Sequence, residues 1–231
     1  MASPDMGVLP YSANVVILGD SFVSRLEGSL HHVFTKSPAA KVMSFNAYCR
    51  DALKAPTEVN NIYFNGWGGS GLTHTAQKRF TLPHSLLISK APKYAILEIG
   101  GNDVDSSASV DSIVKSRIEM ANQLINIYDM YMVALCSILP RDSVRNYTPV
   151  EFRERALAVN IATSDQLKSL PSIYFHKHKG FWRDSGNNEI STLEWSNDGV
   201  HPNEIGMATY QKSITRCIHH LTKAYRNPPR N

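Results

Sequence analysis

Short apolar runs alternate along this chain with segments in which apolar residues recur every three or four positions. The short runs are rich in β-branched and aromatic residues, a pattern typical of strands buried on both faces. They predict five strands, at residues 14–18, 42–48, 94–99, 131–139 and 172–175. A further apolar stretch at residues 61–64 leads into a glycine-rich loop over residues 66–71.

Three segments with helical spacing predict amphipathic helices that cover the strands. These segments are residues 110–128, 154–170 and 207–225. Strands that alternate with helices indicate βαβ units, and therefore a mostly parallel sheet with helices on both faces. The pattern thus predicts an α/β fold, in which ligands bind beyond the carboxyl ends of the strands.

The composition is that of a chain able to bury a full core, with 42% hydrophobic and 19% charged residues in a length of 231. We expect a single domain over residues 1–231, with residues 1–12 and 226–231 as flexible tails. Residues 1–12 lack the basic start and apolar centre of a signal peptide, and no apolar run is long enough to span a membrane. Three cysteines are too few for a disulfide framework, which favours a reducing, cytoplasmic location. The oligomeric state is left open.

The net charge of +4 is spread over the chain, with modest basic clusters at residues 176–179 and 226–230. This distribution favours a solvated surface, although association with nucleic acid stays open. His176 and His178 lie in the first cluster, beside two lysines. Because no Cys, Asp or Glu stands nearby at ligand spacing, we expect both to be surface residues and not zinc ligands. The sequence calls for no metal and no organic cofactor.

Three polar clusters stand where chemistry is expected. Residues 19–21 (Gly-Asp-Ser) and 100–103 (Gly-Gly-Asn-Asp) each follow a predicted strand, and residues 198–201 (Asp-Gly-Val-His) precede the last helix. In a parallel sheet the first two clusters face the same crevice. A serine at a sharp turn from strand to helix exposes its hydroxyl, but it becomes nucleophilic only when a base takes its proton. The same pattern also fits a helix N-cap at Ser21.

His201 is the candidate base, and Asp198 stands three residues before it, near enough to orient the ring if the segment forms a turn. Asp198-Gly199 is also a common turn pair, so a surface turn is the alternative. The Asn102 amide could donate to a developing oxyanion, or could close an Asx turn. Gly71 belongs to a loop that allows backbone N–H groups to approach a ligand closely. That loop lacks the Lys-Ser/Thr ending of a phosphate-binding loop.

Taken together, these clusters resemble the four sequence blocks of the SGNH, or GDSL-type, hydrolases, in the same order. The blocks are residues 19–22 (Gly-Asp-Ser-Phe), 69–73 (Gly-Ser-Gly-Leu-Thr), 100–103 and 198–201, the last followed by Pro202. The resemblance covers nearly the whole chain. The chain is most similar to the compact intracellular branch, which includes platelet-activating-factor acetylhydrolase subunits and the esterase domains of some retrotransposons. Two departures are Phe22, where leucine is usual, and Trp67 within the glycine loop.

The resemblance implies a role for each matching residue. Ser21 would be the nucleophile, His201 the general base and then acid, and Asp198 the residue that orients the ring. The oxyanion hole would combine the Ser21 N–H, the Gly71 N–H and the Asn102 side chain, with Gly69 as a competitor for Gly71. Phe22 would point into the core or lie beside the nucleophile, and Trp67 would be an apolar wall of the acyl site or a surface aromatic.

The fold that the resemblance implies is a three-layer α/β/α sandwich with a five-stranded, flavodoxin-like parallel sheet. The implied activity is hydrolysis of acyl esters through an acyl-enzyme. Because no long insertion could build a lid or tunnel, we expect short-chain or acetyl esters. Carbohydrate or lipid acetyl-esterase activity and a silent binding module on the same fold are the alternatives. The loop at residues 141–152 is expected to flank the cleft, with Arg141, Arg145 or Trp182 either contacting the substrate or lying on the plain surface.

Overall fold

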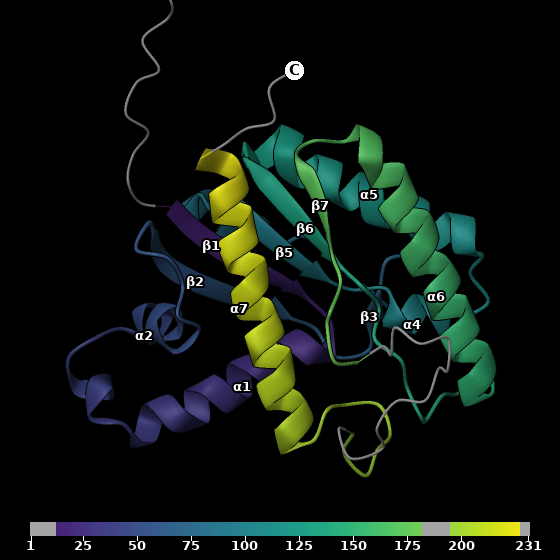
Figure 1. The fold of residues 1–231 in the computed structure, drawn as a ribbon, viewed down its shortest axis with the longest axis horizontal. Helices are drawn as coiled ribbons and strands as arrows, with labels where there is room; N and C mark the ends of the chain where they lie inside the picture. Colours follow the sequence, from purple (N-terminus) through teal and green to yellow (C-terminus); the bar gives the residue numbers. More distant parts are fainter. Residues whose placement is uncertain (1–12, 182–194, 227–231) are drawn as a thin grey trace, which may run out of the picture.

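A central sheet of five parallel strands organises the protein (Figure 1). The computed structural model describes residues 13–181 and 195–226. The strands stand in the order β2-β1-β5-β6-β7. Their bounds are β1 (Ala13–Gly19), β2 (Val59–Gly66), β5 (Tyr94–Glu98), β6 (Met132–Cys136) and β7 (Ile173–His176), and the two-residue strands β3 (Ser70–Gly71) and β4 (Lys78–Arg79) form a separate parallel pair.

Helices cover both faces of this sheet, which confirms the predicted three-layer α/β/α sandwich. Their bounds are α1 (Ser21–Lys36), α2 (Phe45–Ala52), α3 (His84–Lys90), α4 (Gly101–Val104), α5 (Val110–Tyr128), α6 (Pro149–Gln166) and α7 (Glu204–Arg226), with 3₁₀ turns at Pro38–Lys41 and Leu167–Ser169. Side chains of α1, α2 and α7 pack on one face, and those of α3 and α5 pack on the other. Helix α6 lies beside α5 and shares a third group of buried residues with it. No helix in the described part of the chain is long and apolar enough to cross a membrane.

Counted in chain order, the sheet strands stand 2-1-3-4-5, the flavodoxin-like order that the family resemblance implies. The strand order reverses between β1 and β5, so a crevice opens beyond the carboxyl ends of these two strands. Gly19, the last residue of β1, packs so closely on β5 that an added Cβ would lie 2.1 Å from the carbonyl oxygen of Glu98. Only glycine fits there, and the chain can then turn directly into α1.

The strand predicted over residues 42–48 is wrong, because this segment enters α2 instead. Ser44 caps the helix by accepting a hydrogen bond from the Ala47 N–H over 3.3 Å. From there Phe45, Tyr48, Cys49 and Ala52 follow helical spacing and pack on the core beside the sheet. The true second strand is β2, which includes the apolar stretch at residues 61–64. A short apolar run does not distinguish a strand from one face of a short helix.

Other element boundaries shift by a few residues. The strand predicted over 131–139 ends at Cys136, and the helix predicted over 154–170 begins at Pro149 behind a capping box made by Thr148 and Glu151. Tails were expected at residues 1–12 and 226–231. Residues 1–12 and 227–231 lie outside the described residues, whereas residue 226 is the last of α7 and not part of a tail. All three cysteines are free and buried.

Candidate active site

Ser21 is the first residue of α1 and lies directly after the buried end of β1. The cap of this helix is Asp20, whose Oδ1 accepts the Phe22 N–H over 3.1 Å. The sequence left open whether Ser21 itself was the cap, and the structure gives that function to its neighbour. The Ser21 hydroxyl is therefore available for another partner at the positive end of a 16-residue helix.

That partner is His201, whose Nε2 lies 2.6 Å from Ser21 Oγ across 180 residues of sequence. The other ring nitrogen, Nδ1, lies 2.8 Å from Asp198 Oδ2. A proton on Nδ1 satisfies the carboxylate and leaves Nε2 as an acceptor for the serine hydroxyl. The three side chains thus form a continuous line of hydrogen bonds from carboxylate to hydroxyl.

The turn that carries Asp198 and His201 is itself well organised. Asp198 Oδ1 accepts the backbone N–H groups of Val200 and His201, each over 2.9 Å, and the Ser196 hydroxyl over 2.6 Å. Gly199 adopts a left-handed φ of 64°, which suits glycine. The predicted Asp-Gly turn is therefore present, and it orients the histidine. Ser196, which sequence reasoning missed, is recognisable only from its position two residues before the aspartate.

Electrostatics keep the aspartate ionised and the histidine neutral. Partial burial alone would raise the pKa of Asp198, but hydrogen bonds from Ser196, His201 and Val200 hold it well below its usual range. Burial lowers the pKa of His201, and the positive charges of Arg25 and Arg141 lower it further against the attraction of Asp198. Arg25 Nη2 also lies 3.1 Å from Asp198 Oδ2. At neutral pH His201 is consequently a free base facing Ser21.

Asn102 and Asp103 follow β5 in the short helix α4. The Asn102 amide nitrogen donates to the Ser70 carbonyl oxygen over 2.8 Å and lies 3.5 Å from Asp20 Oδ2. The fully buried carboxylate of Asp103 accepts the Leu72 N–H, the Thr73 N–H and the Thr73 hydroxyl, at 2.7–2.9 Å. Asp103, another residue that sequence reasoning left without a role, therefore ties the glycine loop to the end of β5.

The glycine loop lies beside Ser21. A Cβ added to Gly68 would stand 3.9 Å from the Ser21 Cβ. At Gly71 an added Cβ would stand 2.5 Å from the Ala76 Cβ and 2.8 Å from both Asp103 oxygens, so no larger residue fits. Gly69 has a φ of 77° but open space around it. The predicted loop thus borders the serine at Gly68, and the predicted asparagine bonds the same loop at Ser70.

Arg141 differs from expectation. It was expected on a polar loop at the cleft edge, either contacting substrate or on the plain surface, but only 3% of it is exposed. Its guanidinium donates to Asn102 Oδ1 over 3.1 Å and lies 3.8 Å from Asp20 Oδ2. Burial nevertheless raises the pKa of Asp20 to about 7, although the charge of Arg141 opposes that shift. Arg145 uses its backbone N–H to bond Asp105, and Trp182 lies outside the described residues.

The comparison with known families agrees with this geometry. The model of the GDSL-like lipase/acylhydrolase family matches residues 17–209, a span that contains all four sequence blocks. The chain belongs to the GDSL-like lipase/acylhydrolase family. Its members hydrolyse esters, and the family resemblance deduced from the sequence is confirmed. No curated protein matches the chain.

Solved structures of GDSL-like acylhydrolases and related esterases share the fold. A Bacteroides fragilis protein assigned as an acylhydrolase is 16% identical with a TM-score of 0.61, covering 95% of this chain and 90% of its own. A GDSL-like lipase of Bacteroides thetaiotaomicron is 16% identical with a TM-score of 0.58, covering 90% and 88%. An acetyl esterase mutant with an acetate ion is 16% identical with a TM-score of 0.58, covering 92% and 99%.

The two residues by which the chain departs from the common GDSL blocks have different surroundings. Phe22 is buried in the core and its ring centroid also lies 5.7 Å from that of His201, so both predicted placements hold together. Trp67 stays 45% exposed and packs edge-on against Phe80. Trp67 immediately precedes Gly68, which places the indole on the loop that borders Ser21.

The expectation that His176 and His178 are surface residues is wrong. Only 5% of His176 and none of His178 is exposed, because the chain passes beneath α7 after β7. Both rings bond the Ser213 hydroxyl of α7 at 2.9 Å. The second nitrogen of His178 lies 2.6 Å from Glu98 Oε2. In the sequence, Glu98 lies 80 residues from His178 and Ser213 lies 35 residues from it, so local spacing could not reveal these partners.

Proposed function

We propose that this protein is a serine esterase that hydrolyses short-chain, acetyl-type esters through an acyl-enzyme. The observation that carries the proposal is the unbroken line from Asp198 through His201 to Ser21, with contacts of 2.8 and 2.6 Å. Nucleophile, base and orienting acid at hydrogen-bond distance are the arrangement that activates a serine hydroxyl. Membership of an ester-hydrolysing family supports the same conclusion.

In the first half-reaction His201 Nε2 takes the proton of Ser21 Oγ while Oγ attacks the acyl carbon. The resulting tetrahedral intermediate carries its negative charge on the former carbonyl oxygen. We assign the stabilising donors to the Ser21 N–H, the Gly71 N–H and the Asn102 amide. The bond to the leaving alcohol then breaks, and His201 returns its proton to that alcohol.

In the second half-reaction a water molecule replaces the alcohol. His201 removes a proton from this water as it attacks the acyl-Ser21 ester, and the same donors receive the second oxyanion. Collapse of this intermediate returns the proton to Ser21 Oγ and releases the carboxylic acid. Asp198 stays ionised throughout and stabilises the protonated ring, in keeping with the depressed pKa of its carboxyl.

The short-acyl assignment rests on the sequence, in which no long insertion could build a lid or tunnel over Ser21. Asp20 and Phe22, the two neighbours of Ser21, line a small pocket with Gly101, Ile138, Leu139, Arg141, Glu98 and Ile99, and Ser21 itself is not part of that lining. The structural likeness to an acetyl esterase mutant that was crystallised with an acetate ion agrees with this choice. The three free cysteines support the reducing, cytoplasmic location expected for such an enzyme.

The test is hydrolysis of p-nitrophenyl acetate, butyrate and octanoate by the wild type, Ser21→Ala and a matched control, Ser24→Ala. Ser24 lies on the same helix, and within the described part of the chain its hydroxyl bonds the Asp20 carbonyl alone, at 3.5 Å. We expect acetate and butyrate to be turned over faster than octanoate. Loss of the nucleophile should lower kcat by roughly 10⁴-fold or more, whereas Ser24→Ala should stay close to wild type.

Two outcomes would oppose this assignment. If the wild type and Ser21→Ala are equally inert on all three esters, the alternative of a silent binding module takes its place. If octanoate is preferred, the short-acyl assignment fails while the serine mechanism stands. Assays on acetylated sugars and acetylated lipids then separate the two acetyl-esterase alternatives.

A further inference from the structure

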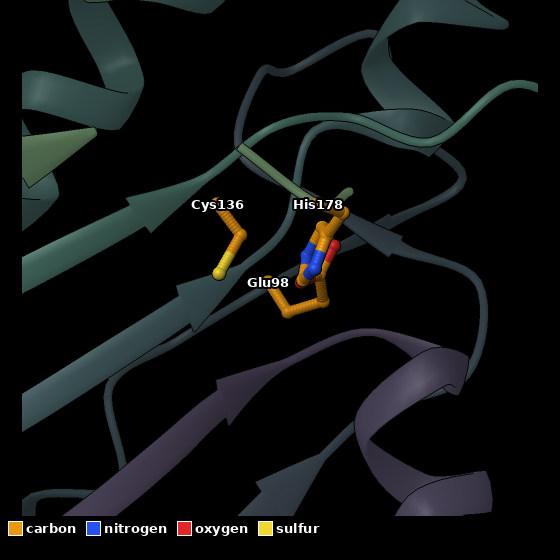
Figure 2. A group of neighbouring side chains, drawn as sticks. All are labelled: Glu98, Cys136 and His178. Carbon is orange, nitrogen blue, oxygen red and sulfur yellow. The ribbon is translucent and has the colours of Figure 1, made fainter. Parts of the chain in front are cut away.

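Glu98, Cys136 and His178 bring three different donor atoms together in the interior of the protein (Figure 2). One ligand atom of each residue, a carboxylate oxygen, a thiol sulfur and a ring nitrogen, lies within 4.8 Å of the other two. The three residues are 5%, 1% and 0% exposed. We refer to them as the Glu-Cys-His cluster. It takes no part in the serine mechanism described above.

The cluster is a product of strand register. Leu97 of β5 pairs with Leu135 of β6, so the next residues, Glu98 and Cys136, are also neighbours and project from the same face. Cys136 pairs in turn with His176 of β7, and His178 follows two residues later. These side chains face α7, because Cys136 packs in the same group of buried residues as Tyr210 and Cys217 of that helix.

One ring nitrogen of His178 is anchored in the way that is usual for a metal-bound histidine, and the other contacts Glu98 at 2.6 Å. Its Nδ1 bonds the Ser213 hydroxyl at 2.9 Å, and this contact fixes the plane of the ring. The other nitrogen, Nε2, then points at the Glu98 carboxylate. Metal-bound histidines nearly always use one nitrogen for the metal and anchor the other on a polar group outside the coordination sphere.

A further polar atom is aimed at the cluster from α7. The Tyr210 side chain is fully buried, and burial and the negative charge of Glu98 raise the pKa of its phenol. Glu98 is the hydrogen-bond partner of the Tyr210 hydroxyl, although the contact falls short of good geometry. This loose contact places the phenol oxygen beside the three convergent donors.

We propose that the Glu-Cys-His cluster is a binding site for a divalent transition-metal ion of the Zn²⁺ type. Mixed nitrogen, sulfur and oxygen donors suit Zn²⁺ and not Mg²⁺ or Ca²⁺, which take oxygen ligands. A dication with one carboxylate, one thiolate and one neutral imidazole has no net charge, which favours burial. The fourth position would be filled by the Tyr210 hydroxyl or by a water molecule.

The required rearrangement is small. In a tetrahedral zinc site, ligand atoms lie about 3.3–3.6 Å apart, given metal–ligand distances of about 2.0–2.3 Å. The Glu98–His178 contact of 2.6 Å would open to that spacing, and the thiol would close from a separation that is at most 4.8 Å. The ion would then join β5, β6 and the segment after β7 beneath α7, so it stabilises the fold and leaves the serine chemistry unchanged.

The test measures metal content directly. Wild type, Cys136→Ser and a control, Cys49→Ser, are produced in zinc-supplemented medium, purified without chelator and analysed by plasma mass spectrometry. Cys49 is buried to the same degree but is not one of the cluster donors. We expect about one zinc per chain in the wild type and in Cys49→Ser, and below about 0.1 in Cys136→Ser.

A second measurement on the wild type alone guards against misfolding of the variant. Protein refolded with Co²⁺ should show the near-ultraviolet absorption of a thiolate–cobalt bond, and Zn²⁺ should raise the Tm relative to chelator-treated protein. The proposal is overturned if the wild type holds no metal after refolding with Zn²⁺ or Co²⁺. It is also overturned if Cys49→Ser loses metal as completely as Cys136→Ser. Esterase activity in the same preparations reports on the serine mechanism separately, so the two proposals can fail independently.

Discussion

The guanidinium of Arg141 donates a hydrogen bond from Nη1 to Asn102 Oδ1 over 3.1 Å, inside a site where the arginine side chain is only 4% exposed. The bond occupies the oxygen end of the asparagine amide, so its nitrogen end faces the glycine loop. A Cβ added to Gly101 would stand 2.6 Å from the same guanidinium. This close approach explains why the second residue of the block at residues 100–103 is glycine. We therefore expect Arg141 to position the proposed oxyanion donor through its bond to Asn102.

Replacing Arg141 with Met is expected to lower kcat by about 10²-fold with little change in KM, because Asn102 loses its orientation and misplaced groups cost about that much. Arg141→Lys should recover only part of the loss, since an ammonium cannot bond Asn102 and reach Asp20 in the same planar arrangement. The measurement is steady-state hydrolysis of p-nitrophenyl acetate at several pH values.

Arg153→Met is the matched control for this experiment. Its guanidinium bonds Asp142 at 2.8 Å, and no contact with Asn102 or Asp20 is seen among the described residues. Equal losses of kcat in the Arg141 and Arg153 variants would show that general destabilisation, and not the orientation of Asn102, explains the effect.

The acid limb of kcat/KM is expected to have its midpoint below the ordinary histidine value of about 6.5. Activity needs neutral His201, so it rises as the pH passes through the pKa of this group, which burial and two arginines lower. Arg25→Gln removes one of those charges and should move the midpoint to higher pH. A limb that stays in place, or moves to lower pH, would contradict the assignment of His201 as the base.

The arrangement of the sheet could be predicted from the sequence because its signals are local. Short apolar runs stop at polar turns, and β1, β5, β6 and β7 were all found this way. The spacing of Asp198 and His201 likewise predicted a contact that a single turn of chain can make. The segment at residues 42–48 failed for the opposite reason. Its aromatic and β-branched residues suit a strand, but tertiary packing on α1 and β2 stabilises α2 instead.

The burial of Arg141, His176 and His178 could not be predicted, since the partners of these side chains lie far away in the sequence. Arg141 appeared to begin a polar loop, yet its carboxylate and amide partners are Asp20 and Asn102 from two other strand ends. His176 and His178 alternate with Lys177 and Lys179, a pattern typical of the surface, but both rings bond Ser213 of α7 in the interior. All three positions lie at the end of a buried strand or within five residues of it, and this is the signal that could have raised them as candidates.

Asp103→Asn is expected to reduce the free energy of unfolding by about 3 kcal/mol, because an amide would place its NH₂ group against donors that a buried carboxylate now accepts. Those donors are the Leu72 and Thr73 N–H groups and the Thr73 hydroxyl. Thr73→Val keeps the two N–H donors but removes the hydroxyl contact with Asp103 and the 2.8 Å hydrogen bond of that hydroxyl with Thr75, and should cost about 1 kcal/mol. Urea unfolding measures both changes. Similar losses in the two variants would show that the carboxylate does not organise the glycine loop.

Gly71→Ala and Gly69→Ala together identify the glycine that supplies the oxyanion N–H. At Gly71 the new methyl group would stand 2.5 Å from the Ala76 Cβ and 2.8 Å from the Asp103 oxygens, so the backbone must move. Gly69 has open space, and alanine there should cost only about 1 kcal/mol for its φ of 77°.

If Gly71 supplies the donor, displacing it should lower kcat by about 10²-fold or more, whereas Gly69→Ala stays within a few-fold of wild type. The measurement is kcat per folded molecule, with the folded fraction taken from circular dichroism. A loss confined to Gly69→Ala would transfer the donor role to Gly69, because its methyl group meets no neighbour that could explain the loss sterically.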